Sequence, residues 1–273
     1  MRVIAVLLTL FALLSCQKSS AQIQPRLAPG AQPQGPQKPV QQFYVEDGGT
    51  REVLENIVIP PKAQAPFSLL RQTEWVKTLS DGGTITLVNQ RRIARDREGR
   101  IYQERWFLVP KNCKDESRMT AIQIADPNDH TSYNCLMLNH RDQCLLSTYT
   151  PSTNAIYEFQ GPPTGLLPDS TGSAIHEDLG KQLIAGLETI GTRDSIIYNP
   201  GVFGNDRTMT VEREFWYSTQ LGINLLSKRS DPRIGTQTFT ATNLIPYEPD
   251  PKLFKLPDGF QVVDQRQTAP PEN

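Results

Sequence analysis

Long segments of alternating apolar and polar residues, separated by short turns, are the feature that most restricts the fold of this 273-residue chain. Residues 67–79 and 84–94 are two such segments. Asp81-Gly82-Gly83 between them is a strong hairpin signal, because glycine accepts positive φ angles. Segments of this length span roughly 30–40 Å as strands. Such lengths favour a strongly curved or barrel-like sheet over a small sandwich.

The alternation continues along the chain and predicts further strands. They cover 101–109, 119–125, 130–137, 143–148, 182–184, 187–198, 209–217, 223–228 and 236–245. Short helices are expected at 51–57 and 250–254. Residues 151–173 are rich in Pro, Gly, Ser and Thr and are interpreted as a long loop with room for one short strand. The sequence therefore predicts a mainly β fold with few short helices: one strongly curved antiparallel sheet of about ten strands, apolar inside and polar outside.

The N-terminus carries the pattern of an export signal. Arg2 precedes an apolar run over 3–14, which reaches about 18 Å as a helix and is too short for a hydrocarbon core of about 30 Å. We interpret residues 1–21 as a secretory signal peptide and expect an exported, periplasmic protein. No later stretch is long and apolar enough to predict a transmembrane span in the mature chain.

Two processing routes remain open for this signal. Ser19-Ser20-Ala21 supplies the small residues needed for cleavage before Gln22. Leu13-Leu14-Ser15-Cys16 resembles a bacterial lipobox, which would end the signal before Cys16 and leave this residue lipidated. The second route would anchor the protein to the outer membrane through lipid.

Composition divides the remaining chain into three regions. Residues 22–49 are rich in Pro and Gln and predict a disordered linker, because so few bulky side chains cannot offset the ordering entropy. Residues 50–263 are expected to form the β domain, and 264–273 a disordered tail.

Three cysteines remain after the leader. An exported chain meets an oxidising compartment, which favours a disulfide. If Asn139-His140 forms a two-residue hairpin turn, Cys135 faces Cys144, and opposed β-carbons lie within disulfide reach. We predict a Cys135–Cys144 disulfide, with Cys113 left over.

No catalytic motif accompanies these features. The chain has only three histidines, lacks a Gly-x-Ser-x-Gly elbow and lacks a phosphate loop. His130, Cys135, His140 and Cys144 fall at near-regular intervals, but alternate residues of a strand point to opposite faces, which disfavours a zinc site. We expect no enzyme activity, no metal and no cofactor. The formal net charge of −1, with both signs interleaved, argues against a nucleic-acid partner.

Three tryptophans carry the strongest indication of ligand binding. Trp75, Trp106 and Trp216 each lie in a different predicted strand. Tryptophans on strands most often belong to the core. The alternative is that these three line a concave apolar surface that binds a ligand.

The C-terminal half resembles a known superfamily. The matching segments are Glu214-Phe215-Trp216-Tyr217-Ser218, Leu221-Gly222, Lys228-Arg229-Ser230-Asp231-Pro232-Arg233, Glu248-Pro249-Asp250-Pro251-Lys252-Leu253-Phe254 and Leu256-Pro257-Asp258-Gly259-Phe260. They resemble the closing strands of bacterial periplasmic proteins related to the outer-membrane lipoprotein carrier, LolA-like and RseB-like. Segments 93–100, 191–193 and 204–207 are similar to uncharacterised exported bacterial proteins of that general kind.

The resemblance covers roughly residues 65–262 and implies a half-barrel whose concave side holds an acyl chain. Two functional hypotheses follow. In the first, a non-catalytic envelope protein binds a hydrophobic ligand, either a lipid or a lipoprotein acyl chain. In the second, the chain is a periplasmic interaction or sensor module with a filled core, no ligand and an envelope protein partner.

Overall fold

A computed structural model describes residues 59–112, 114, 116–137, 142–150 and 163–266. The predicted signal peptide and linker lie outside these residues, as do Cys16, Cys113, the expected helix at 51–57 and the turn at Asn139-His140. Within the described residues, no helix is long and apolar enough to cross a membrane.

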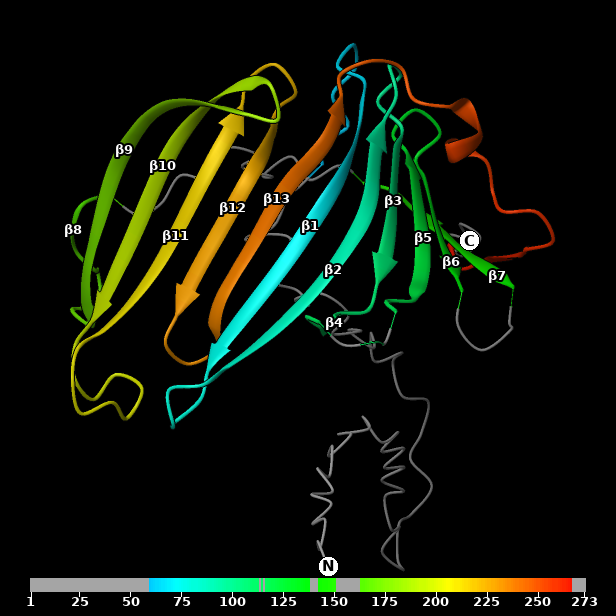
Figure 1. Cartoon of the computed structure of the whole chain (residues 1–273). Coiled ribbons are helices and arrows are strands. Elements are labelled where there is room, and N and C mark those ends of the chain that lie inside the picture. Colours follow the sequence, from blue (N-terminus) through cyan, green and yellow to red (C-terminus); the bar gives the residue numbers. More distant parts are fainter. Residues whose placement is uncertain (1–58, 113, 115, 138–141, 151–162, 267–273) are drawn as a thin grey trace, which may run out of the picture. The chain divides into compact units, whose positions relative to one another are not determined.

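Fourteen strands form a single curved sheet that does not close on itself (Figure 1). They are β1 (Phe67–Thr78), β2 (Thr84–Arg95), β3 (Ile101–Trp106), β4 (Val109–Pro110), β5 (Met119–Asp126), β6 (Thr131–Leu136), β7 (Gln143–Thr148), β8 (Gly165–Leu166), β9 (Gly172–Ile184), β10 (Leu187–Tyr198), β11 (Met209–Ser218), β12 (Ile223–Asp231), β13 (Gly235–Ile245) and β14 (Gln261–Asp264). The predicted mainly β, strongly curved sheet is confirmed. The helical turn expected near 250–254 is the 3₁₀ element η2 (Pro251–Phe254).

The strand order is β14-β7-β6-β5-β3-β2-β1-β13-β12-β11-β10-β9-β8, with β4 beside β2. β14 runs parallel to β7, and the other neighbours are antiparallel. β1 pairs with β13, so the strands of the N-terminal half lie on one side of this seam. Those from β8 to β13 lie on the other side (Figure 1).

Several strand predictions match the structure closely, and two regions differ. The segments 143–148 and 187–198 coincide with β7 and β10. The loop expected over 151–173 contains one short strand, β8, as the prediction allowed, but β9 begins at Gly172 instead of residue 182. Most side chains of β9 are exposed on both faces, so the strand lacks the alternation that marks a half-buried strand. β14 adds a further strand that the sequence did not predict.

The sheet has two chemically different faces, which strand alternation defines. We call the face that carries Phe67, Leu69 and Arg71 of β1 the buried face. The face that carries Gln72 and Glu74 of β1 is called the open face. At one end of the buried face, packed apolar side chains form the core of the protein; they are Phe67, Leu69, Ile93, Leu221, Ile223, Leu225 and Ala241.

A second, smaller apolar cluster lies on the open face at the β3–β5 corner. Tyr102 and Ile124 are buried there, and Leu253, Phe254 and Leu256 from η2 and the residues after it pack against them. The C-terminal segment therefore covers this corner and leaves the centre of the open face, over β13, β1 and β2, without that cover.

Candidate functional site

Arginines occupy the middle of the buried face. Arg71 and Arg91 are directly opposed on β1 and β2, with exposures of 0% and 1%. Arg213 and Arg229 are opposed in the same way on β11 and β12. The expectation of a continuously apolar inner face is therefore wrong: charged groups lie in its centre beside buried apolar side chains such as Phe239.

Neutral oxygens and one carboxylate hold several of these buried guanidinium groups. Arg71 donates to the Thr73 hydroxyl (2.6 Å), and Arg91 donates to the backbone oxygen of Glu104 (3.1 Å). Arg229 donates to Asp231 (3.0 Å). Such bonds are needed because a buried charge without polar partners is strongly destabilising. They place polar and charged groups in the centre of this face.

Arg95 closes the apolar end of the buried face. Its guanidinium donates to the backbone oxygens of Ala65 (3.0 and 2.7 Å), Pro60 (2.8 Å) and Leu221 (2.6 Å) and stacks 5.0 Å from the Phe67 ring centre. Burial lowers the pKa of this group to about 10, which still leaves it charged at neutral pH. One side chain thus joins the segment before β1 to the turn between β11 and β12.

The three tryptophans do not line one surface together. Cross-strand register places Trp75 on the buried face, where its Nε1 donates to the backbone oxygen of Ile234 (2.7 Å). Trp106 and Trp216 lie on the open face. Ligand contact by any one of them stays a prediction.

Trp106 and Trp216 each donate an indole hydrogen bond to a glutamate two positions earlier, a feature that the sequence analysis missed. Trp106 Nε1 donates to Glu104 (2.9 Å), and Trp216 Nε1 donates to Glu214 (2.8 Å). Residues i and i+2 of a strand share a face, so the pattern Glu-x-Trp is the sequence signal for this pair. Burial raises the pKa of Glu214, but bonds from Trp216 and Arg193 outweigh it and lower the pKa overall. Both indoles are therefore tied to the sheet.

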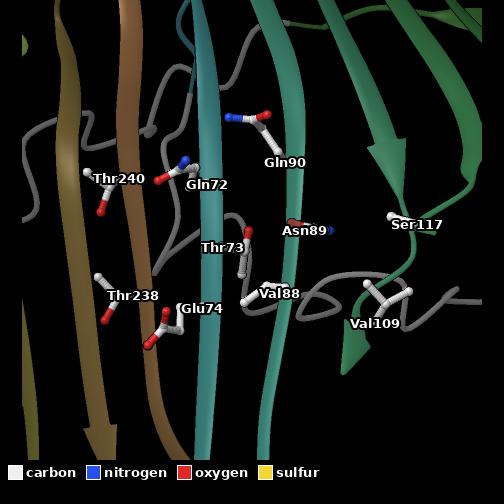
Figure 2. A pocket seen from close by; sticks show the side chains of 10 residues that line it. All are labelled: Gln72, Thr73, Glu74, Val88, Asn89, Gln90, Val109, Ser117, Thr238 and Thr240. Carbon is white, nitrogen blue, oxygen red and sulfur yellow. The ribbon is translucent and has the colours of Figure 1, made fainter. Parts of the chain in front are cut away.

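A groove of about 560 Å³ with both polar and apolar lining crosses the centre of the open face. Its side-chain lining comes from β13, β1, β2, β4 and the segment before β5, as Figure 2 shows: Thr238, Thr240, Gln72, Glu74, Val88, Gln90, Val109 and Ser117. Thr73 and Asn89 also border the groove, although alternation assigns their side chains to the buried face. The volume lies within the range of ordinary ligand sites.

Four polar side chains of this groove have no hydrogen-bond partner among the described residues. Gln72 and Gln90 are directly opposed across β1 and β2, and both are exposed. The described residues give no hydrogen bond to either side-chain amide or to the Thr238 and Thr240 hydroxyls. The strand pairing that brings the four groups together was not evident from the sequence.

The predicted disulfide is confirmed, and it occupies both cysteines of the β6–β7 hairpin. Cys135 and Cys144 are register partners joined by an S–S bond of 2.03 Å. Among the described residues, no group of three or more His, Cys, Asp and Glu side chains gathers as a metal-ligand set.

One histidine–carboxylate pair also lies in the described part of the chain. His176 Nδ1 is 2.6 Å from Oδ1 of buried Asp194. For the described residues, the structure records no hydroxyl or thiol bonded to the other ring nitrogen.

Comparisons with solved structures find similar chains at low sequence identity. It is similar to MucB in the complex structure of Pseudomonas aeruginosa MucA/MucB, with 12% identity over 74% of this chain and 59% of that chain and a TM-score of 0.36. It is also similar to a putative lipoprotein from Parabacteroides distasonis, with 9% identity over 68% of this chain and 97% of that chain (TM-score 0.24).

A third similar structure is a putative outer membrane lipoprotein-sorting protein domain from Vibrio parahaemolyticus. Identity is 6% over 67% of this chain and 86% of that chain, with a TM-score of 0.16. The chain thus spans 59% of the length of the MucB chain in that complex. No protein-family model and no curated protein matches the sequence. These neighbours are of the kind that the sequence resemblance named, and function is argued below from the geometry of this chain.

Proposed function

We propose that this chain is a non-catalytic binding module of the bacterial envelope, and that its site is the groove on the open face. Its partner is a polar macromolecule of the envelope. This corresponds to the interaction-module hypothesis, in which the interior of the sheet is filled. Export through the N-terminal signal would place the module in the periplasm.

The observation that carries this proposal is the contrast between the two faces. The buried face has a packed apolar cluster at one end, and arginines lie among further buried apolar side chains in its centre. The open face holds a groove of about 560 Å³ in which Gln72, Gln90, Thr238 and Thr240 have polar groups to offer. A site with uncommitted hydrogen-bonding groups favours a polar partner, because an apolar ligand would leave them unsatisfied.

Acyl-chain binding is the second candidate, and the apolar cluster on the buried face favours it. A lipid or lipoprotein chain would have to enter between side chains such as Phe67, Leu69 and Leu225, which are at most 1% exposed. Opening a packed core to a ligand costs the contacts among these side chains. This cost makes the second candidate the weaker one.

Titration of the mature chain with an environment-sensitive fluorescent fatty acid separates the two candidates. The proposal predicts no saturable change at micromolar probe. In parallel, a photo-crosslinker placed at Ser117 in cells should give a discrete adduct. The yield should fall in the Gln72→Ala/Gln90→Ala variant and stay constant in the matched Gln182→Ala variant on β9. Saturable fatty-acid binding that is indifferent to the Gln72 and Gln90 substitutions would overturn the proposal in favour of the carrier function.

A further inference from the structure

We infer that the groove on the open face takes an extended polypeptide segment, held through its main-chain amides by Gln72 and Gln90. This inference rests on the proposed function, because it names the chemical class of the partner at the same site. It follows from the layout of the groove, from the chemistry of its lining and from the groups that the lining lacks.

The lining residues form two rows that run across the strands. Register places Thr238, Glu74, Val88 and Val109 in one row and Thr240, Gln72 and Gln90 in the next. Adjacent strands are about 4.8 Å apart, so the longer row covers about 14 Å from β13 to β4. An extended peptide of about four residues has this length. The two rows are two residues apart along each strand, or roughly 7 Å.

The two glutamines provide the chemistry that a peptide main chain needs. Each primary amide offers both a donor and an acceptor, as does each peptide unit. Because Gln72 and Gln90 are opposed and exposed, their amides can face the same side of a bound strand. The Thr240 hydroxyl in the same row can donate or accept. This row therefore matches the repeating N–H and C=O groups of an extended chain without selecting its sequence.

The other row gives the site a direction along the peptide. Val88 and Val109 form an apolar end near β4. At the opposite side, Glu74 forms an exposed ion pair with Lys111 (3.1 Å). Exposed ion pairs contribute little free energy, so a basic group of the ligand could replace Lys111 at small cost. Thr238 lies beside Glu74. The favoured segment therefore has an aliphatic side chain at one end and a basic side chain toward the other.

A glycan is the competing polar polymer of the envelope, and the lining does not suit it. Sugar rings are bound by stacking on exposed aromatic faces, and no aromatic side chain is among the described residues that line the groove. Trp216 is only 8% exposed and its ring is held against Gly191. Trp106 is tied to Glu104 outside the groove. The amide pair consequently points to a peptide.

An array of short synthetic peptides of varied sequence, probed with the mature chain, tests this inference. The bound peptides should share an aliphatic residue and a basic residue a few positions apart. In solution, the affinity of the best peptide should fall about tenfold or more in Gln72→Ala/Gln90→Ala, which removes two or more hydrogen bonds. It should not change in Gln182→Ala. N-methylation of the central main-chain nitrogens of the peptide should cause a similar loss in the wild type.

The outcomes separate this inference from the proposed function. Peptide binding that depends on Gln72 and Gln90 but tolerates N-methylation would overturn main-chain recognition and leave the groove as the site. Binding of chitotetraose, lost in the same double variant, with no peptide bound, would overturn the peptide class alone. Saturable fatty-acid binding without any effect of the two glutamines would overturn both. Circular dichroism of each variant confirms that these exposed substitutions leave the sheet folded.

Discussion

The ring of Trp216 lies directly over the backbone of Gly191, its register partner on the neighbouring strand. A Cβ atom built on Gly191 would be 2.5 Å from Cζ3 of Trp216, closer than any real contact allows. Glycine at this position is therefore required by the indole opposite it, which is itself fixed by the bond to Glu214.

Gly191→Ala should destabilise the protein by about 1–3 kcal/mol, because the added methyl group overpacks the contact with Trp216. Urea denaturation followed by circular dichroism measures the change. In a Trp216→Leu background the same substitution should cost much less, since the ring is absent. An equal cost in both backgrounds would show that the indole is not the cause.

Arg95→Lys should lower the free energy of unfolding by about 2–4 kcal/mol. Lysine keeps the charge but cannot reach the oxygens of Pro60, Ala65 and Leu221 with one planar fork, so buried acceptors lose their donors. Arg92→Lys, at an exposed side chain on the same strand, is the matched control and should change stability by less than about 0.5 kcal/mol. Similar losses in both variants would contradict the role assigned to Arg95.

Reduction of the Cys135–Cys144 disulfide should lower the free energy of unfolding by about 2–3 kcal/mol. The two cysteines are nine residues apart, and without the bond the unfolded chain gains the entropy that closing this loop removes. Thermal unfolding with and without dithiothreitol measures the effect. A Cys135→Ser/Cys144→Ser variant should unfold at the lower temperature under both conditions. A reductant effect that persists in this variant would assign the stabilisation elsewhere.

The stability should fall in acid as Asp231 takes up a proton. Burial raises the pKa of this carboxyl group, but bonds from Arg233 and the charge of Arg229 outweigh it and lower the pKa from 3.8 to about 2. Since the folded state binds the proton more weakly than the unfolded state, the contribution is present above about pH 4 and is lost between pH 4 and pH 2. It amounts to about 2 kcal/mol.

Asp231→Asn should therefore be less stable than the wild type at neutral pH, and the gap should narrow as the pH falls through this window. Urea midpoints across the range give the comparison. Asp206→Asn, at an exposed carboxylate, should leave the profile unchanged. A constant gap between Asp231→Asn and wild type would refute the assignment.

Strand alternation was enough to predict most of the sheet, because a half-buried strand needs side chains of two kinds. It failed at β9, whose Glu177 and Asp178 are exposed with their neighbours, and at β14, whose partner β7 lies far back in the sequence. The side chains of Gln261–Asp264 are all exposed, so this edge strand has no alternating sequence pattern that would predict it.

The candidate site was harder to predict than the fold. Alternation already put position 71 on the same face as Phe67 and Leu69, yet an arginine there is expected to be solvated, since buried charges are rare. Predicting the groove would have required the strand pairing, which composition does not reveal. β1 pairs with both β2 and β13, and this places Gln72 between Gln90 and Thr240. The Cys135–Cys144 pairing was predictable because the two residues are only nine positions apart in the sequence.

The seam between β1 and β13 has a consequence for how the chain matures. It joins residues as distant as Ser68 and Ile245, whereas most other neighbours are linked by short hairpins. β1 can pair with β13 only when nearly the whole chain is available, and until then one row of backbone groups on β1 has no strand partner. Such pairing between residues far apart in the sequence is slow. We therefore expect the pairing of β1 with β13 to form late in folding, and the open edge of β1 to be where premature association between unfolded copies would begin.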